Sequence, residues 1–240
     1  MPNGNPLFNE NAFRQAMSRT EGAMTLQGTI NKTFFLLLMC TVGALISWNN
    51  IQAVAGYTSL IAIVTFAIAM IVIFKKTAAP VLAPLYALGE GLVLGIISAA
   101  YNAQYQGIVG QAIAITFLVF FIMLFLYKTR IIKVTNSLVI GITAATGAIA
   151  LFYIISLLLS VFGVNVAYFG STSALSIGIN VVICAVAAFN FLIDFRFIDQ
   201  LTSQVVAPKY MEWYAGFSLI VTLVWLYLEI LRLLARTRDN

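Results

Sequence analysis

The chain has 240 residues, of which 62% are hydrophobic and 9% are charged; it carries 13 Lys or Arg, 8 Asp or Glu and no His. Soluble domains have roughly half apolar and about a quarter charged residues, so most of this surface requires a lipid bilayer. The lack of His excludes histidine-ligated zinc or haem and Ser-His-Asp hydrolysis. We expect a membrane protein that is not an enzyme and holds no cofactor.

The N-terminal residues 1–29 are polar and of mixed charge. They lack the basic start and the short apolar core of a cleaved signal peptide, so we expect a cytosolic arm. A transmembrane domain is expected over residues 30–235, followed by a short tail at residues 236–240.

Seven apolar stretches follow the arm. A helix needs about 20 mostly apolar residues to cross a hydrocarbon core of about 30 Å, and each stretch is long enough. The links between them are short, which predicts an all-α integral membrane protein built as one seven-helix bundle. The stretches lie near Ile30–Trp48, Ala53–Phe74, Val81–Tyr101, Ile108–Tyr127, Leu138–Phe162, Ala174–Ile193 and Trp213–Leu234.

Lys and Arg residues mark alternate links between the spans. Cytoplasmic loops retain positive charge, so this pattern predicts a cytoplasmic N-terminus. The links after the first, third and fifth spans carry no Lys or Arg. Basic residues precede or open the first span and follow the second, fourth and sixth spans: Arg14, Arg19, Lys32, Lys75, Lys76, Lys128, Arg130, Lys133, Arg196 and Lys209.

The last segment ends with Arg232, Arg236 and Arg238, which seven full crossings would place outside. Either this segment crosses because earlier helices already set the topology, or it is re-entrant and returns to the cytoplasm. The length of Trp213–Leu234 favours a crossing.

The third span combines small residues with one acid. Small residues at four-residue steps let neighbouring backbones approach closely in lipid, so we expect this helix to be central. Glu90 lies near the middle of the span and is a functional candidate, because a carboxylate at that depth must be protonated, paired or hydrated. The alternative is a neutral Glu that serves packing alone. The ladder consists of Ala83, Ala87, Gly91, Gly95 and Ala99.

The sixth span has one polar or small face from end to end. Such a face cannot point into lipid at low cost, so it either makes hydrogen bonds between helices or lines water. Asp194 ends the face near the cytoplasmic side. Its members recur at steps of three or four residues: Ser173, Ser176, Asn180, Cys184, Ala187, Asn190 and Asp194.

Acidic residues gather around the link between the sixth and seventh spans. Asp194, Asp199 and Glu212 lie there with Arg196 and Lys209. Neighbouring carboxylates at a pore mouth can attract a hard cation and respond to pH, which makes Asp194 and Asp199 candidates for transient calcium binding. The alternative for Asp199 and Glu212 is a solvated loop with weak surface pairs.

Glu229 in the last segment has a simple interpretation. Arg232 lies three residues later on the same helical face, so a local ion pair is expected. Glu229 belongs to an ion pathway only if the segment is re-entrant.

Four short sequences are more specific than the hydrophobic pattern. They are MTLQGTINKT at the first span, PLYALGEGLVLGIISAAY in the third, FLIDFRFIDQ at the end of the sixth and LYLEILRLLA in the last. With them, residues 24–235 resemble the Bax inhibitor family of membrane proteins, in a bacterial form. The resemblance implies a bundle whose last helix is wrapped by the others, in a bacterial inner membrane.

The resemblance also implies an activity, described for the family as a pH-sensitive calcium leak that two aspartates latch by sharing a proton. Asp194 matches the first aspartate by its place in FLID. Where the second would be expected, alignment on the aromatic start of the last segment places Val221 or Thr222. Glu212 lies before that position and Glu229 well after it, so the chain departs from the two-carboxylate latch.

The sequence leads to two main hypotheses. The first is a passive, pH-modulated leak for cations, above all calcium, with Asp194 as cytoplasmic gate, Asp199 and Glu212 as auxiliary charges, and Asn180, Asn190, Glu90 and Glu229 as further polar residues of the path. The second is a non-conducting regulator that binds other membrane proteins. A proton-coupled transporter is disfavoured because no inverted repeat is visible. The basic residues serve topology and anionic lipid, so we expect no nucleic-acid partner.

Overall fold

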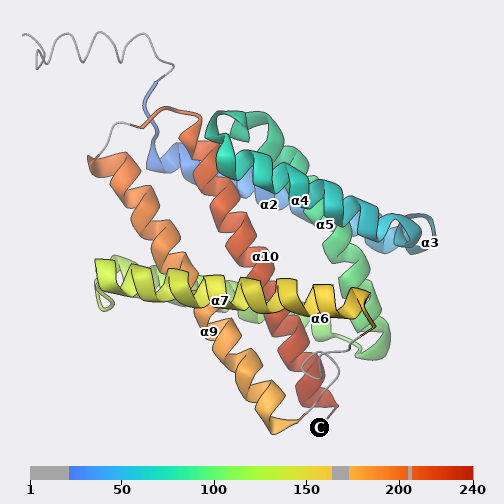
Figure 1. Cartoon of the computed structure of the whole chain (residues 1–240). Helices are drawn as coiled ribbons and strands as arrows, with labels where there is room; N and C mark the ends of the chain where they lie inside the picture. Colours follow the sequence, from blue (N-terminus) through green and yellow to red (C-terminus); the bar gives the residue numbers. More distant parts are fainter. Residues whose placement is uncertain (1–21, 164–172, 205–206, 240) are drawn as a thin grey trace, which may run out of the picture.

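The computed structural model describes residues 22–163, 173–204 and 207–239 (Figure 1). Seven of its helices are long and apolar enough to cross a membrane, which confirms the all-α seven-span fold and an integral membrane protein. Their main helices are α2 (Leu26–Asn49), α4 (Thr58–Phe74), α5 (Ala79–Gln104), α6 (Ile108–Lys128), α7 (Asn136–Val161), α9 (Ala174–Asp199) and α10 (Met211–Arg238), and the second span runs from Ile51 to Phe74. The short elements are α3 (Ile51–Val54), the 3₁₀ turns η2 (Ala55–Tyr57) and η3 (Lys76–Ala78), and the π turn η4 (Gln200–Gln204).

The first helix begins earlier than its apolar run. The Thr25 side chain accepts a hydrogen bond from the Gly28 N–H and caps α2, so the helix starts at Leu26 instead of Ile30. Thr135 and Ser173 cap α7 and α9 in the same way. At the other end of the chain, α10 continues to Arg238, past the expected boundary at residue 235.

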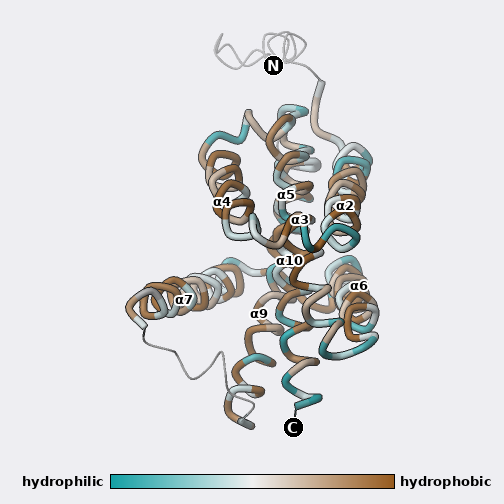
Figure 2. Tube along the Cα trace, turned by 90° about the vertical axis from the view of Figure 1, so that its right-hand side faces the viewer, coloured by the Kyte–Doolittle hydropathy of each residue, from teal (hydrophilic) through white to brown (hydrophobic). Residues whose placement is uncertain are grey.

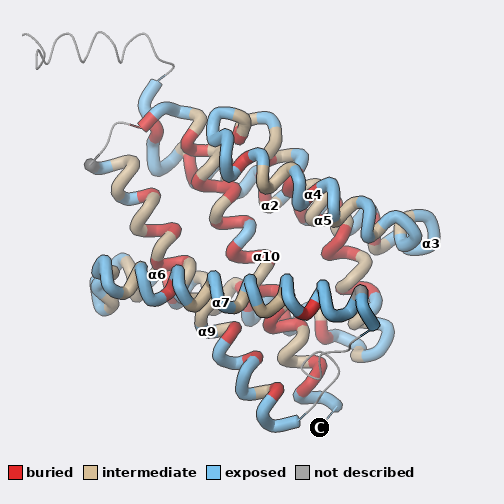
Figure 3. The backbone as a smooth tube through the Cα atoms, in the orientation of Figure 1, coloured by how far each residue is buried: buried red, intermediate tan, exposed pale blue. Residues whose placement is uncertain are grey.

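Helix α10 is the centre of the bundle. It packs against α2, α5, α6 and α9, and it is the most buried of the seven long helices (Figure 3). Hydrophobic residues predominate along the surrounding helices, while hydrophilic residues gather mainly at helix ends and links (Figure 2). The last helix therefore occupies the central position that the resemblance implied.

The small-residue ladder of α5 forms the contact with α2. A Cβ atom built on Gly91 would clash with the carbonyl oxygen of Cys40, and one on Gly95 would clash with Ser47 Oγ. The two backbones meet at these glycines, and α5 also packs against α4, α6 and α10. This confirms that the small residues of α5 allow a close helix contact and that α5 has several neighbours in the bundle.

The two ends of α10 lie at opposite ends of the bundle. Near its start, the Met24 N–H donates to the Ala207 carbonyl at 2.8 Å, which places the segment before α2 beside the α9–α10 link. At its end, Arg238 donates to the Gln106 carbonyl in the link between α5 and α6. Because α10 is one uninterrupted helix between these points, it matches the crossing and not the re-entrant alternative (Figure 1).

Candidate functional site

Asp194 is a residue of α9 and lies six positions before η4 begins at Gln200. Its side chain points to α10. Its side chain is buried, with 8% of the residue exposed. Ser218 Oγ donates to Asp194 Oδ1 at 2.6 Å, and Thr222 Oγ1 donates to Oδ2 at 2.7 Å. Each carboxylate oxygen is thus held by a hydroxyl of the central helix.

No cation neutralises this carboxylate within the described residues. The ion pair found in that part of the chain joins Arg232 and Glu229. Arg196, two residues after Asp194, donates instead to the Val134 carbonyl and to Asn136 Oδ1 at the start of α7. Asp194 is therefore a buried acid supported by neutral hydroxyl donors, an arrangement that is sensitive to its protonation state.

Two aromatic residues at the start of α10, Trp213 and Tyr214, contact basic side chains of other elements. Tyr214 on α10 is close enough to interact electrostatically with Asp194. Lys76, at the link between α4 and α5, lies with Nζ 5.2 Å from the centre of the Tyr214 ring. Lys32 on α2 lies 4.7 Å from the ring centre of Trp213 in the same turn of α10. These contacts lie at the end of the bundle where α10 begins. They involve three of the basic residues that mark the expected cytoplasmic side: Lys32, Lys76 and Arg196.

Asp199 and Glu212 do not join Asp194 in one acidic group. Asp199 is exposed, and its contact is a 3.4 Å hydrogen bond from the Tyr127 hydroxyl. Glu212 is only 2% exposed and accepts hydrogen bonds from both the N–H and the hydroxyl of Thr25, each at 3.0 Å. Within the described residues, no group of three or more Asp, Glu, Cys or His side chains could hold a metal ion.

Glu212 therefore has a structural role that its place in the sequence did not reveal. It ties the start of α10 to the cap of α2, and a Cβ atom on Gly28 would clash with its Oε1. The glycine leaves the space that the carboxylate occupies. The expectation that Glu212 faces the pore mouth with Asp199 does not fit these contacts.

The polar face of α9 makes hydrogen bonds to both of its neighbours. Asn190 donates to Thr146 Oγ1 on α7 at 2.8 Å. Asn180, fully buried, donates to Glu229 Oε2 on α10 at 3.0 Å, while its Oδ1 has no hydrogen-bond partner within the described residues. Of the two interpretations of this face, hydrogen bonds between helices account for Asn180, Asn190 and Asp194.

Glu229 is the centre of a second polar cluster, toward the C-terminal end of α10. It is 1% exposed and accepts hydrogen bonds from the Tyr153 hydroxyl at 2.7 Å and from Arg232 Nη1 at 2.9 Å. The expected ion pair with Arg232 is confirmed. Sequence reasoning missed Tyr153 and did not connect Asn180, a residue of the predicted polar face, with Glu229, because no local spacing links α7 and α9 to Glu229.

Arg236 is a further buried residue that sequence reasoning did not single out. It is 5% exposed and donates to the Ser176 carbonyl at 3.0 Å, near the start of α9. Between this cluster and Asp194, α9 and α10 contribute apolar residues to the buried hydrophobic core: Ala187, Phe191, Leu223 and Leu226. The helix pair thus has a polar site toward each end and an apolar block between them.

Glu90 lies on α5, apart from the α9 helix. It is partly buried and close enough to Cys40 on α2 and Tyr86 on α5 for electrostatic interaction. Tyr86 in turn packs edge-on against Phe217 of α10, with ring centres 4.8 Å apart. Within the described residues, no hydrogen bond or ion pair involves the Glu90 carboxyl group.

Comparison with curated proteins gave no match. A family model described as Bax inhibitor 1 like matches residues 5–239, which is nearly the whole chain. The match agrees with the resemblance of the short sequences and with a membrane protein of seven spans. The chain therefore belongs to the Bax inhibitor 1-like family of membrane proteins.

Proposed function

We propose that this protein is a pH-modulated passive leak for cations, with calcium as the main substrate, and that Asp194 is its gate. The observation that carries the proposal is the buried Asp194 carboxylate, which is held by Ser218 and Thr222 of the central helix and has no cationic partner in the described residues. An acid in a membrane bundle that is neither paired nor exposed is a candidate for handling ions.

The gate follows from the hydrogen bonds of that carboxylate. In the ionised form, both oxygens accept a hydrogen bond from α10 and hold the two helices together. Protonation turns one oxygen into a donor, so the hydroxyl at that oxygen must rotate and accept instead, and both ties between α9 and α10 lose the strength that a charged acceptor gives them. Acid then favours an open packing of this helix pair, and the apolar block of Ala187, Phe191, Leu223 and Leu226 is the barrier that has to part.

The proposed orientation places the Asp194 end of the bundle in the cytoplasm of a bacterium, with the protein in the inner membrane. The contacts of Lys32, Lys76 and Arg196 at that end support it, because positive residues are retained on the cytoplasmic side. In this orientation Asp194 receives calcium at the cytoplasmic mouth, and the Glu229–Arg232 cluster lies toward the opposite face.

A second candidate function is a non-conducting regulator that binds other membrane proteins. The observation that favours it is α7, which packs mainly against α9 and leaves most of its length exposed (Figure 3). A helix with so little contact inside its own bundle offers a face to another membrane protein.

Reconstitution distinguishes the two functions. Purified protein is placed in vesicles that contain a calcium-sensitive dye, and calcium entry is followed between pH 5 and pH 8. A leak predicts calcium entry that rises toward acid pH in the unchanged protein. Asp194→Asn, which cannot ionise, should give a flux that no longer changes with pH, while Asp239→Asn at the opposite end of α10 serves as the matched control. Absence of flux in the unchanged protein, together with crosslinking of α7 to a partner in membranes, would support the regulator.

A further inference from the structure

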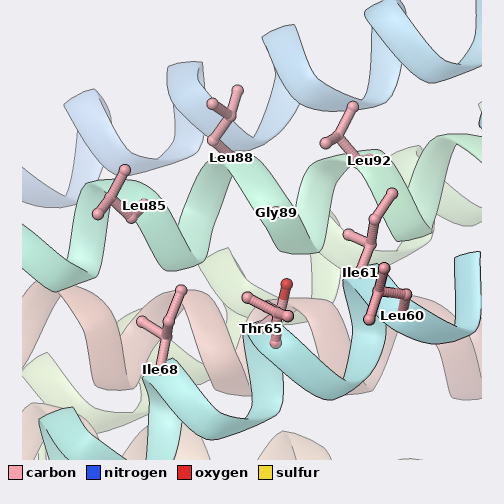
Figure 4. Close-up of a pocket in the computed structure, with 9 residues that line it drawn as sticks. Leu60, Ile61, Thr65, Ile68, Leu85, Leu88, Gly89 and Leu92 are labelled. Atoms are coloured by element: carbon pink, nitrogen blue, oxygen red, sulfur yellow. The ribbon is translucent and has the colours of Figure 1, made fainter. Parts of the chain in front are cut away.

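A groove lies on the outer side of the α4–α5 hairpin (Figure 4). It has a volume of about 340 Å³ and opens away from the bundle. Its walls are almost entirely aliphatic, and Thr65 is the one hydroxyl residue that lines it. The lining residues are Leu60, Ile61, Val64, Thr65, Ile68, Leu85, Leu88, Gly89 and Leu92.

The middle of the groove is a notch between Thr65 and Gly89. A Cβ atom on Gly89 would lie 2.5 Å from Thr65 Oγ1, so any larger residue at this position would meet α4. Figure 4 shows the Thr65 side chain pointing toward Gly89 across the gap between the two helices. The two helices are therefore in contact at Thr65 and Gly89, and both residues line the groove.

Apolar side chains continue from the groove to the link that joins the two helices. Val64 and Leu85 are each 50% exposed at the groove, and Val81 is 69% exposed nearer to the link. The link itself begins with Lys75 and Lys76, both exposed. One end of the apolar strip therefore meets two positive charges.

The start of α5 adds to the positive potential at this end. No side chain caps its first turn, and that turn contains no acidic residue. The Ala79 N–H donates to the Lys76 carbonyl and Pro80 has no N–H, so phosphate at this link is favoured by the helix dipole and by the lysine side chains. An anionic head group thus fits the chemistry of this link.

The dimensions fit one lipid chain. Ile68 precedes Lys75 by seven residues and Thr65 precedes it by ten, which corresponds to about 10 Å and about 15 Å along a helix. One leaflet of a bilayer core is about 15 Å thick. An acyl chain whose head group lies at Lys75 therefore reaches the notch between Thr65 and Gly89.

We propose that the α4–α5 groove is a binding site for an anionic phospholipid, with one acyl chain along the groove and the phosphate head group at Lys75 and Lys76. This site does not rest on the proposed leak: it involves neither Asp194 nor α9, although one of its two lysines, Lys76, also contacts the Tyr214 ring of α10. It would hold the α4–α5 hairpin against the leaflet that is rich in anionic lipid.

Native mass spectrometry of the full chain tests the proposal. The protein is purified in detergent with an equal mixture of phosphatidylglycerol and phosphatidylethanolamine that carry the same acyl chains. We expect at least about tenfold more phosphatidylglycerol on the unchanged protein, because each lysine near an anionic lipid contributes roughly a fivefold preference. The double variant Lys75→Gln, Lys76→Gln should lose this preference, whereas Lys128→Gln, Lys133→Gln in another basic link should keep it.

A second pair of variants tests the acyl chain. Leu85→Trp fills the groove and should reduce the bound phosphatidylglycerol about tenfold, while Leu118→Trp, at a 59% exposed position of α6, should leave it unchanged. Helix content by circular dichroism and elution volume confirm that each variant is folded. Equal retention of both lipids by the unchanged protein, or equal loss of phosphatidylglycerol in the groove variants and their controls, would overturn the proposal.

Discussion

Thr222 donates its hydroxyl hydrogen to Asp194 Oδ2 across the α9–α10 interface at 2.7 Å. The resemblance to the Bax inhibitor family implied a second aspartate near this place, and the alignment left Val221 and Thr222 as its counterparts. In the structure Thr222 faces Asp194, while Val221 is 37% exposed. The chain thus keeps the contact between the last two helices and has one carboxyl group in it instead of two.

Removal of the Thr222 hydroxyl should move the pH response of the leak. Thr222→Val keeps the shape of the side chain but deletes one donor to the ionised Asp194. A hydrogen bond to a charged group contributes about 1.5–3 kcal/mol, so the pH of half-maximal calcium flux should rise by about one unit or more. Calcium entry into vesicles across a pH series measures it.

The control for this variant is Thr116→Val on α6. Thr116 is also buried, but its hydroxyl donates to the Ala112 carbonyl within its own helix. Its loss should leave the pH response unchanged. An identical pH profile for Thr222→Val and the unchanged protein would contradict the role of Asp194 as the gate.

The glycines of α5 should be more sensitive to substitution than glycines that face lipid. Gly91→Ala drives a methyl group into the Cys40 carbonyl oxygen, so α2 and α5 must separate, at a cost of about 1–3 kcal/mol. Gly110→Ala on α6 meets no atom within 4 Å. Thermal unfolding in detergent should show a lower Tm for Gly91→Ala and an unchanged or higher Tm for Gly110→Ala; equal Tm values would count against the close contact.

The two acids near the α9–α10 link should differ in their effect on stability. Glu212→Ala removes the buried carboxylate that accepts both Thr25 hydrogen bonds, so we expect a loss of about 1–3 kcal/mol. Asp199→Ala removes an exposed side chain with one long hydrogen bond, and its effect should stay within about 0.5 kcal/mol. Thermal unfolding in detergent compares the two. A larger effect at Asp199 would show that Glu212 is not the structural tie.

The spans could be predicted from the sequence because hydrophobic length is a local property. All seven were found, and the errors were at the ends, where single side chains decide the boundary. Thr25 is an example: its hydroxyl caps α2 inside a stretch that looks polar, so the helix starts before the apolar run does. The α5 ladder was also predicted, since small residues at four-residue steps are typical of a close helix contact in lipid.

The partners that the acids find on other helices could not be predicted in this way, whereas the local pair of Glu229 and Arg232 could. Thr25 and Glu212 are 187 residues apart, and Tyr153 is 76 residues from Glu229. Such pairs depend on how far each helix is rotated and where it crosses its neighbour, which the sequence of one helix does not determine. For Asp194 the sequence predicted the burial, because Asp194 ends a polar face that has to turn inward; that face contacts α10 at Asn180 and Asp194 and α7 at Asn190.

The ion pair between Glu229 and Arg232 provides the sharpest test of the second polar cluster. The Arg232 side chain is 26% exposed and the Glu229 side chain only 2%, so the carboxylate depends more on the pair than the guanidinium does. Arg232→Gln leaves a buried charge with the neutral donors Tyr153 and Asn180, which should cost about 3–5 kcal/mol. The double variant Glu229→Gln, Arg232→Gln removes the buried charge as well, so its Tm in detergent should lie above that of Arg232→Gln alone. A double variant that is less stable than Arg232→Gln would mean that Glu229 is held in its ionised form by Tyr153 and Asn180 without need of the arginine.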